Sequence, residues 1–227
     1  MLLPFNFQRD PYVILDFSAS NPDLTPLPQQ VASQSMLDLT DTSAFTDYVF
    51  GKLQTAGAKV GVGGYNEHRV IYRRSKHFQL TPNGEPAEPR EIHLGIDLWA
   101  NAGTPIFAPL KGTVHSFQDN AHFGDYGPTI ILEHETPAGK LYSLYGHLTC
   151  ESLRGLYEGK VVEAGEKFAE IGPFPENGDW PPHLHFQLIT NMLGFQGDFP
   201  GVCSLTDREK FLAICPNPNA LLNIPGL

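Results

Sequence analysis

Residues 181–189 read PPHLHFQLI, and the alternation within this stretch sets the interpretation of the whole chain. Leu184 and Phe186 alternate with histidines, as expected of a β-strand with one buried face. The two prolines end the preceding loop, because proline cannot donate to a central strand ladder. The other face presents His183 and His185, roughly 7 Å apart at the backbone. One imidazole could bind a metal while the other faces the metal's water; the alternative is a pair of solvated surface histidines.

In the rest of the chain, glycine and proline are frequent: the whole sequence has 22 glycines and 20 prolines, and they separate many short apolar runs. This pattern predicts a mainly β protein with few short helices. The predicted helices are residues 43–55, which Asp41 or Thr42 can cap and Gly57 can end, and, more weakly, residues 207–214. The predicted strands are residues 13–17, 69–73, 104–108, 112–117, 129–134, 140–145, 168–171 and 183–189.

A glycine cluster at residues 58–64 suggests a boundary between segments of the chain. Residues 1–60 are interpreted as an N-terminal accessory extension, because the candidate chemistry lies beyond them. Residues 61–195 form the expected core. Residues 196–227 are a C-terminal extension whose Pro- and Asn-rich tail, residues 216–219, resembles a linker or a loose end.

Charge and composition exclude several classes of function. The formal net charge is −10, and the only basic run, residues 69–76, is short and mixed. Nucleic-acid and anionic-membrane partners are therefore not expected. No apolar run is long enough to cross a membrane, and Met1 to Phe5 lack the basic start of an export signal. Three cysteines without Cys-x-x-Cys spacing indicate reduced thiols, so a cytoplasmic protein is expected.

His93 and Asp97 form a second candidate pair. On a straight strand, residues four apart lie about 13 Å from each other, too far to share one metal with bonds of about 2 Å. Gly95 lies between them and the sequence that follows disfavours a helix, so a glycine-centred kink is expected. Alone, a His-x-x-x-Asp spacing is weak evidence.

His147 is the third candidate. Alternation along residues 141–147 places it on one strand face with Ser143 and Tyr145, and Gly146 leaves room for a close neighbour. A lone strand histidine is more often structural than catalytic. His115, His122 and His134 are interpreted as structural or surface residues.

In combination, the His93-x-x-x-Asp97, Tyr145-Gly146-His147-Leu148 and His183-Leu184-His185-Phe186 signatures resemble those of the M23 peptidases, the lysostaphin-type zinc endopeptidases. The stretches 102–109, 112–114 and 162–166 resemble the same family in order and spacing. The resemblance covers roughly residues 60–190. Residues 197–201 and the tail also resemble the M23 segments of large cytosolic multidomain proteins.

The resemblance implies a twisted antiparallel sheet with a zinc-bearing groove. It implies one Zn²⁺ per chain, with His93, Asp97 and His185 as ligands and His147 and His183 as catalytic histidines. This agrees with the chemistry, since three protein ligands leave a zinc position open for water. Side chains lining the cleft are expected to be Arg69, Tyr72, Tyr145 and Trp180, although an ordinary strand or core position would also account for them.

The expected function is hydrolysis of a peptide amide bond in peptidoglycan-type or Gly- and D-amino-acid-containing peptides, with histidine general acid/base catalysis. Two alternatives stay open. One is a non-catalytic module that binds a peptide or a protein partner. The other is a latent enzyme in which residues 1–60 cover the open zinc position.

Overall fold

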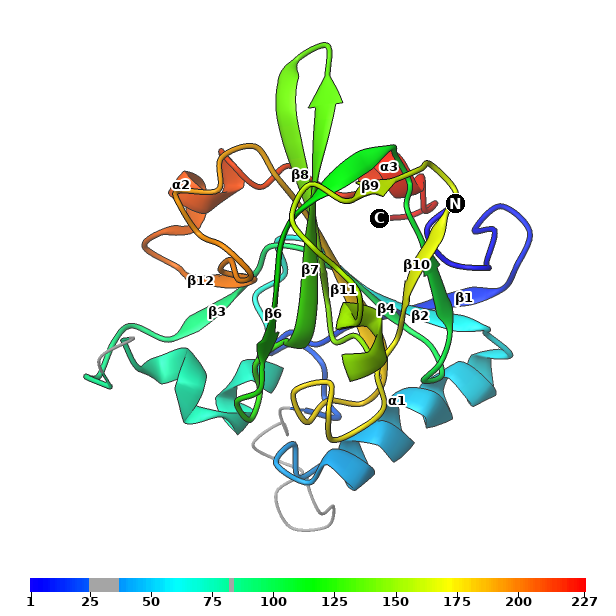
Figure 1. Cartoon of the computed structure of the whole chain (residues 1–227). Helices are drawn as coiled ribbons and strands as arrows, with labels where there is room; N and C mark the ends of the chain where they lie inside the picture. Colours follow the sequence, from blue (N-terminus) through cyan, green and yellow to red (C-terminus); the bar gives the residue numbers. More distant parts are fainter. Residues whose placement is uncertain (25–36, 82–83) are drawn as a thin grey trace, which may run out of the picture.

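The computed structural model describes residues 1–24, 37–81 and 84–227, and its central feature is an eight-stranded sheet (Figure 1). Only the edge pair β1–β2 is parallel; the other neighbours are antiparallel. The predicted mainly β fold is thus confirmed. In spatial order the strands are β1 (Tyr12–Leu15), β2 (Val60–Gly63), β4 (Ile96–Trp99), β11 (His183–Ile189), β8 (Gly139–Gly146), β7 (Gly127–Thr136), β6 (Gly112–Asn120) and β9 (Val161–Val162).

Two short antiparallel pairs flank this sheet: β5 (Pro105–Phe107) with β10 (Lys167–Glu170), and β3 (Arg90–His93) with β12 (Val202–Ser204). The helices are α1 (Thr42–Ala56), α2 (Arg208–Leu212) and α3 (Asn219–Leu222), with 3₁₀ turns η1 (Ile71–Arg74), η2 (Lys76–Gln79) and η3 (Cys150–Leu153). No helix in the described ranges combines the length and the apolar character needed to cross a membrane.

The alternation predicted for β11 is present. Leu184, Phe186 and Leu188 are buried in the largest hydrophobic cluster, with apolar residues of β4, β7 and β8. His185 and Gln187 point away from this cluster and make polar contacts instead. The central strand therefore separates an apolar core from a polar, equally buried, region.

The predicted helix at residues 43–55 is α1. The Asp41 side chain accepts hydrogen bonds from the amides of Ser43 and Ala44, and Gly57 ends the helix with φ of +62°. The helix therefore begins after the predicted Asp41 cap and ends at the predicted glycine, Gly57. The second predicted helix, residues 207–214, is present in part, as α2.

Residues 69–73 are not the predicted strand. Arg69 pairs with Ser18 through an isolated bridge, and the chain then turns into η1. The physical reason is that the Arg69 side chain is fully buried and binds Asp97. This ion pair, and not hydrogen bonding in a sheet, determines the path of the segment. Every other predicted strand overlaps an observed one.

The glycine cluster at residues 58–64 belongs to β2, between β1 and β4 in the sheet. A Cβ atom at Gly61 would lie 2.7 Å from the Leu15 side chain, and one at Gly63 would lie 2.6 Å from the Arg69 guanidinium. Close packing, and not a linker, explains these glycines. Residues of the first segment thus share the central sheet with the rest of the chain.

The C-terminal tail is packed, contrary to the loose end expected for residues 216–219. The Asn219 side chain binds the backbone of Ile224, which is buried in the main core. Tyr12 donates to the carbonyl of Pro225, which brings the two ends of the chain together (Figure 1). The hydrogen bond from the Ile224 amide to the Asn219 side chain and the burial of Ile224 hold the tail against the core.

Candidate metal centre

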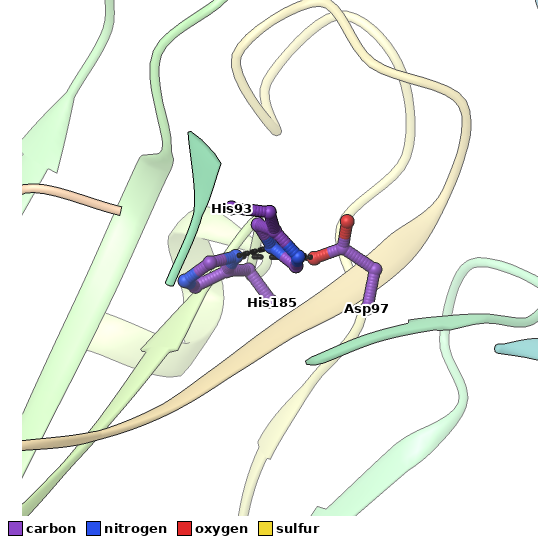
Figure 2. Close-up of side chains that lie close together, drawn as sticks. All are labelled: His93, Asp97 and His185. Atoms are coloured by element: carbon purple, nitrogen blue, oxygen red, sulfur yellow. Dashed lines mark hydrogen bonds and ion pairs between the residues drawn. The ribbon is translucent and has the colours of Figure 1, made fainter. Parts of the chain in front are cut away.

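His93, Asp97 and His185 meet at one point, although they come from three strands (Figure 2). His185 lies opposite Asp97 in the β4–β11 register. The His185 Nδ1 atom is 3.0 Å from both the His93 Nε2 atom and the Asp97 Oδ1 atom, and His93 Nε2 is 3.2 Å from Asp97 Oδ1. Ligands around a tetrahedral Zn²⁺ are about 3.3 Å apart, given bonds of about 2 Å. The donor set fits such a metal ion.

Gly95 provides the kink expected between His93 and Asp97. β3 ends at His93 and β4 begins at Ile96, so His93 and Asp97 belong to different strands. A Cβ atom at Gly95 would lie 2.6 Å from the His185 ring and 2.8 Å from the carbonyl oxygen of Phe186. Only glycine leaves space for the imidazole here.

We expect Gly95→Ala to lower the free energy of unfolding by about 1–3 kcal/mol, because the methyl group overpacks the site against backbone. Metal affinity falls as well, because the His185 ring must move. Urea denaturation and chelator competition measure the two effects. The matched control is Gly51→Ala on α1, where a Cβ meets nothing within 4 Å and helix propensity predicts a gain. Equal behaviour of the two variants would contradict the packing argument.

Arg69 contacts the Asp97 carboxylate on the side away from the two imidazoles. Its guanidinium binds the Asp97 Oδ2 atom, which leaves Oδ1 facing the two imidazoles. Arg69 also donates to Glu67 and to the carbonyl oxygen of Gly64, and that carbonyl accepts from His93 Nδ1 at 2.7 Å. Arg69 is fully buried and does not line the cleft, so the substrate contact expected for it is replaced by an ion pair with Asp97.

The protonation states suit a divalent cation. Burial by itself would raise the pKa of Asp97, but the neighbouring His93 and the Arg69 guanidinium hold it well below its usual value. Burial, followed by the charge of Arg69, lowers the pKa of His93 to about 4. Near neutral pH the site therefore offers a carboxylate and a neutral imidazole, the forms that bind metals.

His147 and His183 lie next to each other, with ring centroids 4.1 Å apart. His147 Nδ1 contacts the carbonyl oxygen of Asn177 at 2.8 Å, and His183 Nδ1 contacts that of Pro181 at 2.8 Å. A carbonyl can only accept, so each Nδ1 carries a proton and each neutral imidazole has a basic Nε2. Both rings belong to the cleft and stand outside the three-ligand cluster.

Aromatic walls enclose these two histidines. Trp99 stacks on His183 with a centroid distance of 4.0 Å, and Trp180 approaches both rings at 6.0 and 6.1 Å. Burial lowers the pKa of His183 to about 4, and burial lowers the pKa of His147 well below 6.5. Both imidazoles are therefore neutral near pH 7 in the metal-free protein.

This burial predicts a pH dependence of stability in metal-free protein. His93 and His183 have folded pKa values of about 4 against 6.5 unfolded. Below pH 6.5 the unfolded chain binds protons that the folded chain does not, so stability falls as pH drops towards 4. By pH 5 each histidine is expected to remove up to about 2 kcal/mol.

Urea midpoints between pH 7.5 and 5, with chelator present, measure this loss. The His183→Gln variant, which lacks one of the two groups, is expected to lose less stability over the same range. A wild-type midpoint that does not change would show that these histidines are not buried as neutral groups.

The backbone turns at His147, where alternation predicted a continuing strand. β8 ends at Gly146, and His147 has φ of +63°. The turn separates His147, which lines the cleft, from Tyr145, which lies on β8 and is fully buried against Phe168 and Phe186 in the main core. The contact with substrate expected for Tyr145 is therefore corrected to a core position.

A cleft of about 880 Å³ opens in front of the site. Tyr72 and Trp180, both expected there from the sequence, line it together with His147 and His183. In the described ranges, no residue from 1–60 contributes to the lining. The segment 25–36, part of the extension that could have covered the site, lies outside the described residues.

Tyr126 is a site residue that the sequence interpretation missed. It lines the cleft, and its hydroxyl lies 3.4 Å from His185 Nε2. A Cβ atom at Gly146 would lie 2.5 Å from its ring, and one at Gly201 would collide with its hydroxyl. The expected close neighbour of Gly146 is therefore Tyr126, which these two glycines accommodate.

Residues 91–195 match the sequence profile described as Peptidase family M23. These residues are therefore similar to an M23 peptidase domain. Among curated proteins, the chain is 30% identical over 133 residues to DD-carboxypeptidase/endopeptidase Mpg of Neisseria meningitidis, covering 57% of this chain and 27% of that protein. It is 30% identical over 104 residues to L-Ala–D-Glu endopeptidase of Bacillus subtilis, covering 44% and 30%.

The chain thus spans only about a quarter to a third of the length of these curated relatives. Among solved structures, the chain is similar to the catalytic domain of lysostaphin from Staphylococcus simulans. That similarity has a TM-score of 0.39 and 23% identity, and it covers 59% of this chain and 80% of that one.

Proposed function

We propose that this chain is a zinc-dependent peptidase of the M23 type that hydrolyses a peptide amide bond, with one Zn²⁺ held by His93, Asp97 and His185. The observation that carries the proposal is the donor set, whose three atoms lie 3.0 to 3.2 Å apart. Two imidazoles and one carboxylate are the ligands of many catalytic zinc sites, and they leave one position open.

When bound, zinc supplies a Lewis acid and lowers the pKa of a water molecule. Proton transfer is assigned to the pair His147 and His183, whose Nδ1 atoms are committed to backbone carbonyls. Each Nε2 atom is then available to accept a proton from the attacking water and to return it to the leaving amine. Their low pKa values favour the neutral, basic form before the reaction.

Tyr126 is proposed to donate its hydroxyl proton to the oxyanion that develops on the scissile carbonyl. Burial raises the pKa of Tyr126 well above its usual value, so the hydroxyl stays protonated and can donate. The hydroxyl lies in the cleft beside the ring of His185, one of the three proposed ligands.

The substrate class is proposed to be peptidoglycan-type peptides that contain glycine or D-amino acids. The names of the two curated relatives, a DD-carboxypeptidase/endopeptidase and an L-Ala–D-Glu endopeptidase, support this class. Cytosolic amides of similar shape are the alternative if the protein resides in the cytoplasm, and cell fractionation tests that setting.

Digestion of a peptide panel, followed by mass spectrometry, tests the function. Protein of known zinc content is incubated with glycine-rich, D-amino-acid and all-L peptides. Cleavage that stops with a chelator and returns with Zn²⁺ is expected. Stoichiometric zinc without cleavage of any peptide would favour the non-catalytic binding module instead.

A further inference from the structure

Gln187 lies directly behind His185 on the same face of β11. The Gln187 Oε1 atom is 3.0 Å from His185 Nε2, the ring nitrogen that points away from Asp97. Gln187 is fully buried, so water does not compete for this contact. One of the two atoms must carry the proton of this contact.

The hydrogen bonds of the Gln187 amide show which atom carries it. Its Nε2 group donates to the carbonyl oxygen of Pro200 at 3.2 Å and to the Cys215 sulfur at 3.4 Å. A flipped amide would place its oxygen against the Pro200 oxygen, and two acceptors repel each other. The amide oxygen therefore faces His185, and because this oxygen cannot donate, His185 Nε2 must carry the proton.

We propose that Gln187 is a positioning residue that fixes the proton of His185 on Nε2 and thereby presents the lone pair of Nδ1 to the metal. This inference rests on the proposed zinc site. Nδ1 is the atom that lies 3.0 Å from both His93 Nε2 and Asp97 Oδ1. Without Gln187, the Asp97 carboxylate would draw the proton to Nδ1 and occupy the lone pair that the metal needs. Tyr126 alone does not prevent this, because its hydroxyl is 3.4 Å away and can donate or accept.

The orientation of Gln187 depends on residues that lie outside the matched family segment. That segment ends at residue 195, whereas the groups that orient Gln187 belong to Pro200 and Cys215. Cys215 lies at the end of the α2 region and packs in a separate hydrophobic cluster with Phe199 and Cys203. The C-terminal extension thus supports the metal site through one amide.

Two substitutions separate a positioning role from a structural one. Gln187→Met has similar size but neither accepts nor donates, whereas Gln187→Glu keeps the acceptor and loses both donor contacts. A merely structural role predicts that both variants weaken zinc binding. The positioning role predicts about 10- to 100-fold weaker zinc affinity for Gln187→Met and rescue by Gln187→Glu.

Zinc affinity is measured by chelator competition on the full chain, with urea denaturation to follow stability separately. Met192→Ala, which removes a buried side chain of the same hydrophobic cluster but neither hydrogen-bond partner of the Gln187 amide, is the matched control and should bind zinc within a few-fold of wild type. Equal affinity of Gln187→Met and wild type, or equal weakening of the Met and Glu variants, would overturn the proposal.

Nuclear magnetic resonance of zinc-loaded wild type provides a readout that does not depend on variants. Long-range ¹H–¹⁵N correlations should place the His185 proton on Nε2 and the metal on Nδ1; the opposite assignment would overturn the proposal even if a variant fails to fold. Failure of wild type to bind zinc would instead contradict the proposed function, so the two failures are distinguishable.

Discussion

His93→Ala is expected to abolish stoichiometric zinc binding and, with it, peptide hydrolysis. The substitution removes one of two imidazole donors and leaves a carboxylate and a single imidazole, one ligand fewer than the three that hold zinc in catalytic sites. Loss of an outer-shell partner alone commonly costs 10- to 100-fold in affinity, so loss of a ligand should exceed about 100-fold. Elemental analysis after dialysis against a weak chelator measures the effect.

His134→Ala is the matched control for this prediction. His134 is equally buried, but it contacts Ser143 and the carbonyl oxygen of Lys111 on the sheet and stands outside the metal cluster. It should lose stability and keep its zinc. Full zinc in His93→Ala, or no stoichiometric zinc in wild type, would show that the ligand assignment is wrong.

His183→Ala is expected to lower kcat by about 10²- to 10⁴-fold while leaving zinc content unchanged. The His183 ring lies in the cleft beside His147, and it has no place among the three metal ligands. Steady-state kinetics on the best peptide, together with elemental analysis of the same sample, separate the two effects. The stacking partner Trp99 also loses its contact, so fluorescence should report the change.

His115→Ala is a control at a histidine that contacts Tyr142 and lies outside the cleft. It should retain kcat. If His183→Ala also loses zinc, His183 is a ligand and not a proton-transfer residue. If it retains full activity, proton transfer belongs to His147 alone.

Several parts of the fold could be predicted because their signals are local. The strand alternation of β11, the caps of α1 and the kink at Gly95 depend on neighbours within a few residues. The strand predicted at residues 69–73 was wrong because the position of Arg69 is set by Asp97, 28 residues away. No local pattern reports such an ion pair.

The same distinction applies to the site. The sequence drew attention to His93, Asp97 and His185 through spacing and resemblance. Their meeting point depends on the β4–β11 register, which joins Asp97 and His185 across 88 residues. Tyr126 and Gln187 carried no motif, although Gly146 and Gly201 record the space that the Tyr126 ring needs.

The amino-acid pattern alone predicts a mainly β chain with two histidines on one face of a strand and a second pair of candidate ligands at a glycine kink. The folded structure was needed to show that Tyr145 belongs to the core, that Arg69 pairs with Asp97, and that Gln187 faces His185. Alternation predicts the face on which a side chain lies only as long as the backbone stays extended. At His147 the backbone takes a left-handed conformation, so the alternation no longer applies. Strand register and long-range hydrogen bonds then decide which faces meet.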